Sequence, residues 1–377
     1  MSSASKIKIG RKIGTSGDPL QASVFSMKRG FFLLEFDELA EILASAGFRA
    51  FRAKQVWEGV YKKKIFSFSE ITNLPADLRK FLSDNFEIKT ALPQRKRTSS
   101  DDTGKYLFEL SDGYFIESVL LEAPEGEGDE LRKTLCISTQ VGCAQGCRFC
   151  ASTMRGFKRN LDSSEIVSQL LPFVKNGEFE FENIVVMGMG EPLANFENAV
   201  KALYIIKDRF GFGARRITLS TCGIADKLKE LAEMKFPFRL AISLHGASND
   251  VREKIMPVNK RFPLEVLLPA AKAFAKSNGR MITLEYILID KVNDSFSDAK
   301  LLSDIANSLH AHVNLIPYNR VEGLDWKRPS SDRRKAFFNA LKSKGVSCTL
   351  RREKGSDIEA ACGQLALIAE RQKLENM

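Results

Sequence analysis

Cys143-Ala-Gln-Gly-Cys147-Arg-Phe-Cys150 is the stretch of this 377-residue sequence from which the rest can be interpreted. Three cysteines at this spacing can bind an iron–sulfur cluster and leave one of its irons without a protein ligand. A structural zinc site would normally take a fourth Cys or His close by. The nearest candidate, Cys136, lies in an apolar run that predicts a strand. The sequence favours a cluster with an open iron; a three-thiolate zinc site and chance clustering of cysteines are the alternatives.

The Cys-x3-Cys-x2-Cys spacing, with Phe149 before the last cysteine, resembles the signature of the radical S-adenosylmethionine (SAM) enzymes. This resemblance implies that SAM binds the open iron through its amino and carboxylate groups. The expected cofactors are therefore a [4Fe–4S] cluster on Cys143, Cys147 and Cys150, and SAM.

Composition bounds the class of protein. Apolar residues make up 44% of the sequence and charged residues 28%, which is typical of a soluble globular protein. No apolar run approaches the roughly eighteen residues that a membrane helix requires. Residues 1–30 contain six Lys or Arg against one acid and lack a secretion signal, so we expect a flexible N-terminus. Seven cysteines, four of them within fifteen positions, do not fit a secreted disulfide framework, and an oxygen-sensitive cluster favours the cytoplasm.

Positive charge is concentrated near the N-terminus. The formal net charge is +10, and residues 1–100 contain 18 Lys and Arg against 10 Asp and Glu, a net charge of +8. Such basic modules commonly bind nucleic-acid phosphates, although a solvated basic surface is the alternative. We expect residues 31–100 to form a basic helical RNA-binding accessory domain.

Helices are predicted in this region over 33–46, 48–64 and 75–85. The middle one interleaves basic residues with Phe51, Trp57 and Tyr61. Aromatic side chains at these positions can stack on RNA bases or pack in a small core, and the sequence favours neither. Residues 94–104 have the composition of a linker and are predicted to separate two domains.

The catalytic domain is predicted over residues 101–365, followed by a C-terminal tail over 366–377. A hairpin, 105–110 with 114–121 about Asp112-Gly113, leads into it. Strand and helix patterns then alternate, which indicates a parallel sheet. The predicted strands are 134–138, 184–187, 216–220, 239–243, 281–288, 312–316 and 347–350, and the predicted helices include 163–175, 264–278, 295–309 and 331–344. About six such units are too few to close an eight-stranded barrel, so we expect an α/β fold with a partial (β/α)6-type barrel.

Chemically reactive residues follow the predicted strands, at the end of a barrel where active sites lie. The cysteine triplet follows the first strand, Gly188-Met-Gly-Glu-Pro192 the second and Thr221-Cys-Gly223 the third. Gly190 would let the backbone approach a ligand and Glu191 could accept its ammonium group, unless the pair only forms a tight turn with a capping carboxylate.

Further polar residues end later strands. Ser220, Ser243 and Asn319 are suited to bind a ribose, a carboxylate or an adenine edge, although a serine in this place is more often a helix cap. His245 has no Ser or Cys nucleophile near it in the sequence pattern, which favours ligand binding over acid–base catalysis.

Two other cysteines have contexts that favour chemistry. Cys362 is followed directly by Gly363, so a mobile loop could bring its sulfur to a substrate, and Cys136 lies seven residues before the cluster motif. Each of them taken alone is more often a small buried apolar residue. We expect Cys222 and Cys348 to be structural.

Several separated stretches together resemble the radical-SAM RNA adenine methyltransferases of the RlmN and Cfr type. The stretches are 136–150, 156–161, 188–192, 219–223, 242–245, 256–259 and 360–365, and the likeness runs from about Leu33 to Leu365. Pro192 after Glu191, and the run that begins at Gly156, resemble the branch that methylates C2 of adenine. The branch that methylates C8 usually has Ala after that Glu. Cys222, where the family often has another small residue, departs from the pattern.

The resemblance implies that adenosine 2503 of 23S rRNA and adenosine 37 of tRNA become 2-methyladenosine, with two SAM consumed per turnover. One SAM would methylate Cys362, and the cluster would cleave a second to the 5′-deoxyadenosyl radical that activates this methyl group. Cys136 would release the product by forming a disulfide with Cys362, and Glu117 would accept a proton. The SAM-binding positions would be Gly190, Glu191, Ser220, Ser243, Leu244, His245 and Asn319.

The same resemblance implies a flavodoxin-like electron donor, and we expect a monomer. Two other functions fit the sequence. One is C8 methylation of adenine, and the other is an RNA-binding iron–sulfur protein without turnover, which would have no need of Cys362.

Overall fold

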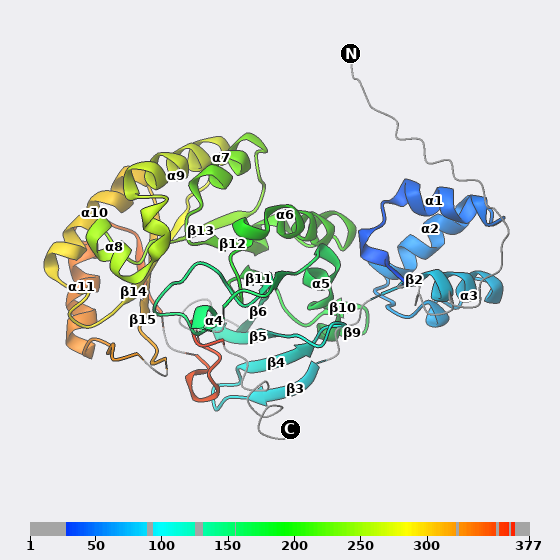
Figure 1. The fold of residues 1–377 in the computed structure, drawn as a ribbon, viewed down its shortest axis with the longest axis horizontal. Coiled ribbons are helices and arrows are strands. Elements are labelled where there is room, and N and C mark those ends of the chain that lie inside the picture. The colour runs from blue at the N-terminus through cyan, green and yellow to red at the C-terminus, as the bar shows by residue number, and fades with distance from the viewer. Residues whose placement is uncertain are drawn as a thin grey trace, which may run out of the picture.

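A mixed β-sheet forms the centre of the computed structural model, which describes residues 28–88, 93–124, 131–154, 156–321, 324–351, 354–361 and 363–365. Within these ranges, ten strands form one sheet in the order β16-β15-β14-β13-β12-β11-β6-β5-β4-β3 (Figure 1). Their bounds are β3 Pro93–Thr98, β4 Gly104–Glu109, β5 Phe115–Pro124, β6 Leu131–Cys136, β11 Asn183–Val186, β12 Ile217–Thr221, β13 Arg239–Ser243, β14 Thr283–Leu288, β15 His312–Pro317 and β16 Cys348–Leu350.

The sheet has an antiparallel part and a parallel part that meet at β6. Strands β3 to β6 pair antiparallel, and β6 then pairs parallel with β11, from which the parallel pairing continues to β16. Both end strands of this order have one neighbour each, so the sheet does not close. The predicted α/β class, the partial barrel and the hairpin that leads into it are confirmed.

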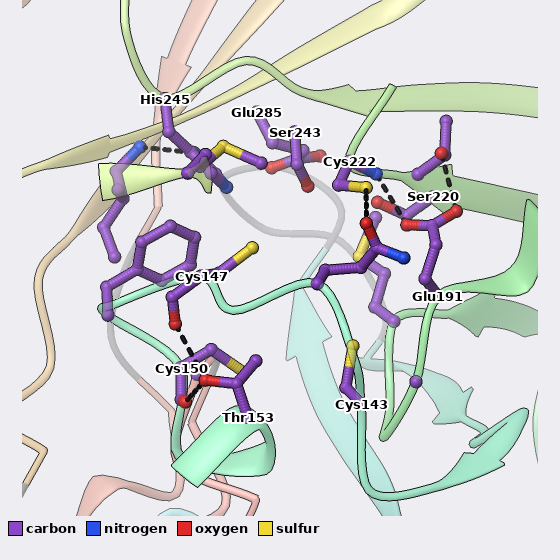
Figure 2. A pocket seen from close by; sticks show the side chains of 18 of the residues that line it. Cys143, Cys147, Cys150, Thr153, Glu191, Ser220, Cys222, Ser243, His245 and Glu285 are labelled. Atoms are coloured by element: carbon purple, nitrogen blue, oxygen red, sulfur yellow. Dashed lines mark hydrogen bonds between the residues drawn. The ribbon is translucent and has the colours of Figure 1, made fainter. Parts of the chain in front are cut away.

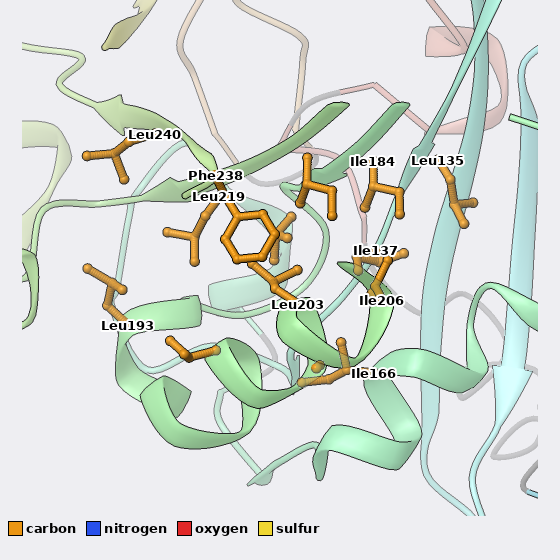
Figure 3. Close-up of a cluster of buried hydrophobic side chains, with 14 of the residues drawn as sticks. Leu135, Ile137, Ile166, Ile184, Leu193, Leu203, Ile206, Leu219, Phe238 and Leu240 are labelled. Atoms are coloured by element: carbon orange, nitrogen blue, oxygen red, sulfur yellow. The ribbon is translucent and has the colours of Figure 1, made fainter. Parts of the chain in front are cut away.

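Helices lie along the outer side of the parallel strands (Figure 1). They are α5 Ser163–Ser168, α6 Phe196–Tyr204, α7 Ala225–Glu233, α9 Leu264–Asn278, α10 Phe296–Leu309 and α11 Ser331–Ser343. Two shorter helices are α4 Ala151–Met154, directly after Cys150, and α8 Asn249–Ile255, after β13. Between the sheet and α6, strand residues such as Leu135, Ile184 and Leu219 pack against Leu203 and Ile206 in a dry core (Figure 3). Strands buried on both faces have the continuous apolar sequence that made them recognisable.

Two predicted segments differ from the structure. The helix expected over 163–175 ends at Ser168, because a 3-10 turn at Leu171–Phe173 contains Pro172, which has no N–H to donate, and a two-strand ribbon of β9 Val174–Lys175 and β10 Glu178–Phe179 follows. The linker expected over 94–104 is wrong, because β3 occupies its first half and pairs with β4. The side chains of 94–98 are exposed, as suits an edge strand, and so lack the alternation that identifies other strands.

The N-terminal region contains α1 Phe36–Ser45, α2 Phe51–Trp57 and α3 Ala76–Asn85, and its β1 Arg29–Gly30 pairs with β2 Phe86–Glu87. Tyr61 follows α2 in a π-helical turn and is 1% exposed, and burial raises its pKa to about 12. The ring centroids of Trp57 and Tyr61 are 4.5 Å apart. Of the two alternatives, core packing holds for both side chains, whereas Phe51 is 48% exposed.

Arg209 joins this region to the rest of the protein. It lies in the π-helical turn after α6 and donates hydrogen bonds to the carbonyls of Leu34 at 2.7 Å and Phe32 at 3.2 Å. Its guanidinium also lies over the rings of Trp57 and Tyr61. This mostly buried guanidinium therefore donates to backbone carbonyls in and after the 3-10 turn Phe31–Leu33, which would otherwise lack a hydrogen-bond partner. Among the described residues, no helix is long and apolar enough for a membrane span.

Arg209→Met should loosen the N-terminal region, because the buried carbonyls of Phe32 and Leu34 lose a charged donor. We expect a loss of about 2 kcal/mol of local stability. Hydrogen exchange of the amides in α1 and α2 measures it. Arg215→Met, at an exposed neighbouring position, is the control and should leave exchange unchanged; equal exchange in the two variants would contradict the role of Arg209.

Candidate active site

A pocket lies at the carboxyl ends of the parallel strands (Figure 2). It holds about 850 Å³ of space between atoms, part of it open to solvent. Residues from the ends of five consecutive strands line it, together with the cysteine loop. The lining residues are Cys143, Gln145, Cys147, Phe149, Cys150, Thr153, Val186, Met187, Gly188, Gly190, Glu191, Ser220, Thr221, Cys222, Ser243, His245, Met256, Glu285, Ile287, Ile316 and Gly363.

The conformation of the cysteine loop is fixed by hydrogen bonds to its backbone carbonyls and by a glycine. The Thr153 hydroxyl, in α4, donates to the carbonyls of Cys147 at 3.0 Å and Cys150 at 2.8 Å (Figure 2). Gly142, at φ +73°, precedes the first cysteine, and a Cβ there would lie 1.8 Å from the carbonyl oxygen of Gly156. The loop can therefore fold only with glycine at this position, and it turns its three thiols to one pocket.

These thiols fit an iron–sulfur cluster by their chemistry. Cys143, Cys147 and Cys150 all line the pocket, and soft thiolate ligands from one short loop are the donors such clusters use. Burial raises the pKa of Cys143 to about 12 and that of Cys147 well above its usual value. Metal binding would therefore release protons from this loop. In the described part of the chain, no group of three or more Cys, His, Asp or Glu is placed to hold a single metal ion.

Glu191 faces the same pocket and is fixed by hydrogen bonds. Its carboxylate accepts from the N–H of Cys222 at 2.7 Å, the hydroxyl of Thr221 at 2.7 Å and the N–H of Leu193 at 2.9 Å. Burial raises its pKa, and these donors oppose the rise. Gly190 has φ +102°, and a Cβ there would lie 2.6 Å from Cβ of Gln140, so only glycine fits. Cys222, expected to be structural, lines the pocket beside Glu191.

His245 is a neutral, oriented imidazole. Its Nδ1 accepts a hydrogen bond from the N–H of Ile287 at 3.0 Å, and the Phe149 ring stands edge-on to it at 4.7 Å between centroids. Burial, with a contribution from the charge of Arg252, lowers the pKa of His245 to about 3. The ring therefore presents a neutral Nε2–H to its surroundings at physiological pH.

Two other predicted ligand-binding residues do not line the pocket. Leu244 is fully buried, and its N–H donates to the carbonyl of Glu285 at 3.0 Å. Asn319 is 5% exposed, and its side-chain oxygen accepts from Arg328 at 2.8 Å. Both follow strands whose ends form the pocket wall.

Glu117 and Cys136 lie on one face of the antiparallel part of the sheet. Glu117 of β5 makes a 2.9 Å ion pair with Lys105 of β4. Cys136 is opposite Val119 in the β5–β6 register and packs with Ile358, Ala360 and Leu365. Cys362 itself lies outside the described residues.

The residues around position 362 contact both the pocket and the apolar cluster that contains Cys136. Gly363 lines the pocket, and its carbonyl accepts from the N–H of Ala151 at 2.7 Å. Ala360 and Leu365 belong to the apolar cluster that contains Cys136. One segment thus connects the pocket that holds the cysteine triplet with the sheet face that holds Cys136 and Glu117.

Sequence reasoning missed several residues of the site. Gln145, Thr153 and Met256 line the pocket although the sequence did not single them out, and Phe149, predicted only as part of the cysteine signature, lines it too. Glu285 could have been found, because it is a single acid inside an apolar strand; burial raises its pKa, and Asn314 donates to it at 2.9 Å. Arg252 is fully buried and donates to the carbonyl of Cys222, although its helical sequence context resembles a surface.

Two family models match this chain, and both concern known classes of enzyme. The model of the radical SAM superfamily matches residues 137–300, and that of the ribosomal RNA large subunit methyltransferase N-terminal domain matches residues 32–88. A "Probable dual-specificity RNA methyltransferase RlmN 3" of Opitutus terrae is 55% identical, over 89% of this chain and 94% of that protein. A "Dual-specificity RNA methyltransferase RlmN" of Campylobacter fetus is 44% identical, over 92% and 99%. A solved radical SAM methyltransferase from Sphaerobacter thermophilus is 38% identical, with a TM-score of 0.83 over 89% of this chain and 99% of that chain.

The low pKa of His245 makes stability depend on pH. The unfolded chain binds a proton at this histidine below about pH 6.5 and the folded chain does not until about pH 3, so stability falls as pH drops through that window. Between pH 7 and pH 5 we expect a loss of about 2 kcal/mol from this residue, measured by urea unfolding. His245→Asn should remove this part of the pH dependence of the free energy of unfolding. His310→Asn, at the exposed end of α10, is the control and should keep it.

Cys147→Ala should abolish iron binding, because it removes a thiol from the loop that carries the cluster ligands. Iron content and the visible spectrum after anaerobic reconstitution measure the effect. Cys348→Ala is the matched control: this thiol is buried in β16, away from the pocket, and its loss should leave the iron content unchanged. A full cluster in Cys147→Ala would remove the three-cysteine assignment.

Proposed function

Because the chain belongs to the RlmN family of radical SAM RNA methyltransferases, we propose that it converts an adenosine of 23S rRNA and of tRNA, at positions 2503 and 37, to 2-methyladenosine. C2 of adenine is an electron-poor aromatic carbon without a lone pair. It therefore cannot act as the nucleophile that a polar methyl transfer from a sulfonium requires. When bound, the cluster and SAM would supply a methyl group and a radical able to remove hydrogen from it. The other steps fall to residues of this chain.

The pocket is the proposed site for the cluster and SAM. Cys143, Cys147 and Cys150 would hold the cluster, and Glu191 would receive the ammonium group of SAM, since its carboxylate is already oriented by three donors. Gly190, Ser220, Ser243 and His245 line the same space and would contact the rest of SAM. Leu244 and Asn319 would support the wall from behind, through their bonds to Glu285 and Arg328.

Three other residues would act on the methyl group and the base. Cys362 would take a methyl group from one SAM and carry it to C2; the second SAM of each turnover would activate it there. Glu117 would accept the proton that leaves C2. The thiolate of Cys136 would then attack the Cys362 sulfur. The S–S bond would form as the bond between that sulfur and the transferred carbon breaks, and the carbon would keep that electron pair and take up a proton in the released product.

One observation carries this proposal. Residues on either side of Cys362 pack against the two places that the reaction must connect, Gly363 at the pocket and Ala360 with Leu365 around Cys136. A cysteine that only filled space would not require a segment that joins these two places.

The accessory region would bind the RNA. Phe51 is exposed, and the Arg52 guanidinium lies 4.7 Å from its ring centroid, which is the pairing of aromatic and cationic groups that single-stranded RNA binds. We keep the helical part of the domain expected over 31–100, which ends with β2 at Glu87, as the proposed RNA-binding domain; β3 belongs to the sheet of the proposed catalytic domain, expected over 101–365. A flavodoxin-like electron donor, a cytoplasmic location and a monomeric state remain part of the proposal.

The two distant cysteines give the sharpest test, because their proposed roles differ in time. Cys362→Ala should give no 2-methyladenosine from transcribed RNA, because nothing carries the methyl group. Cys136→Ala should attack the RNA but stall with the adenosine joined to the Cys362 sulfur through the transferred carbon. Mass spectrometry after nuclease and protease digestion measures this adduct, and Cys348→Ala, away from the pocket, is the cysteine control.

Normal turnover by Cys136→Ala would move the releasing role to another residue. Formation of 8-methyladenosine by the unaltered protein would assign it to the C8 branch. No methylated nucleoside with a reconstituted cluster, reductant and SAM would favour an RNA-binding iron–sulfur protein.

A further inference from the structure

Lys105 and Glu117 form an ion pair that is almost completely enclosed. The ammonium nitrogen lies 2.9 Å from the carboxylate, and the two side chains are 5% and 3% exposed. The pair lies on the face of the antiparallel strands that also holds Cys136. Among the described residues of the elements packed here, Asp357 and Glu359 have exposed side chains, and Cys136 is a further buried titratable group.

The cover over this face is the segment 355–361, which immediately precedes Cys362. Ile358 and Ala360 from this segment pack with Leu107, Phe115 and Val119 of β4 and β5. Figure 1 shows the same segment, in red, running beside α4 and the antiparallel strands. If the segment moved away, the ion pair would face water.

The same ammonium also holds the segment. Lys105 Nζ donates to the carbonyl of Glu359 at 3.1 Å, so Lys105 contacts both Glu117 and the backbone of the cover. The turn between β3 and β4 adds three further hydrogen bonds: the N–H of Gly355 donates to Asp101 at 2.9 Å, and the hydroxyl of Ser99 and the N–H of Ser100 both donate to Asp357.

The energetics of such a pair are asymmetric. A buried ion pair with both partners present is close to neutral for stability, because attraction offsets the loss of hydration. Removing one partner leaves a buried charge without compensation, which is strongly destabilising, whereas removing both is tolerated. Loss of the charge of Glu117 should therefore destabilise the packing of segment 355–361 over the pair.

We propose that Lys105 is a positioning residue that couples the charge of Glu117 to the docking of segment 355–361. With Glu117 ionised, the ammonium is balanced and the segment is held in place. The consequence for catalysis rests on the proposed function: a proton passes from C2 of adenine to a Glu117 oxygen, and the electron pair of that C–H bond stays with the ring. Lys105 then keeps only the Glu359 carbonyl, so the segment ahead of Cys362 is loosened once the new bond exists.

Hydrogen exchange of the holoenzyme tests the coupling without any RNA. Glu117→Gln imitates the protonated carboxyl and should speed exchange of the amides of 355–361 by about ten-fold or more. Lys105→Met should do the same. The double variant Lys105→Met/Glu117→Gln removes both charges of the pair, so its exchange should return to within about three-fold of the unaltered protein.

Two controls accompany these variants. Lys133→Met breaks the more exposed pair of Lys133 with Glu122, 2.8 Å apart on the neighbouring strands, and should leave 355–361 unchanged. Amides of α9 should exchange equally in all proteins. Additive effects in the double variant, or no effect in Glu117→Gln, would overturn the proposal, because a side chain that only fills space gives no rescue.

The exchange experiment and the test of the proposed function can fail independently of each other. Absence of 2-methyladenosine from the unaltered enzyme would remove the catalytic role of Glu117, whereas the exchange rates of the four proteins decide the docking by themselves.

Discussion

Strand β6 determines the geometry of this protein, because it pairs antiparallel with β5 on one side and parallel with β11 on the other. Cys136 is opposite Val119 in the first pairing and opposite Val185 in the second. The strand therefore fixes the Glu117 face of the antiparallel part relative to the pocket in the parallel part. A shift of one residue would turn Cys136 to the opposite face of the sheet, away from the cover. Backbone hydrogen bonds, rather than side-chain contacts, thus set the spacing between the two places where chemistry would occur.

The pocket is an environment of low dielectric constant, in which the charge of each group is set by its neighbours. Burial raises the pKa of Glu191 and of the thiols of Cys143 and Cys147, and lowers the pKa of His245. Arg252 is a buried cation behind this wall, bonded to the carbonyl of Cys222 and to Asn259. A ligand entering this place would meet groups that backbone N–H donors already hold in position, such as Glu191 and His245.

The sequence predicted those parts of the fold that have a local signal. Continuous apolar strands followed by Gly, Ser or Cys revealed the parallel sheet and the residues that gather at its end, and the cysteine spacing revealed the loop. Strand β3 was missed, since its exposed basic side chains show no alternation. Lys105 and its contact with Glu359 were also missed, because the two residues are far apart in the chain and nothing in either local sequence indicates the other. The roles of Cys136, Glu117 and Cys362 depended on the family resemblance and stay proposals.

The position of Arg209 in the chain has a consequence for synthesis on the ribosome. The helices α1 to α3 emerge first, but Arg209 and Phe210, whose ring packs against Phe32 and Tyr61 at 5.8 and 5.1 Å between centroids, follow more than a hundred residues later. At ordinary translation speeds this interval is on the order of ten seconds. During it Phe32 and Tyr61 lack their contacts with Arg209 and Phe210, so in this interval a nascent chain would be prone to aggregate or to need a chaperone.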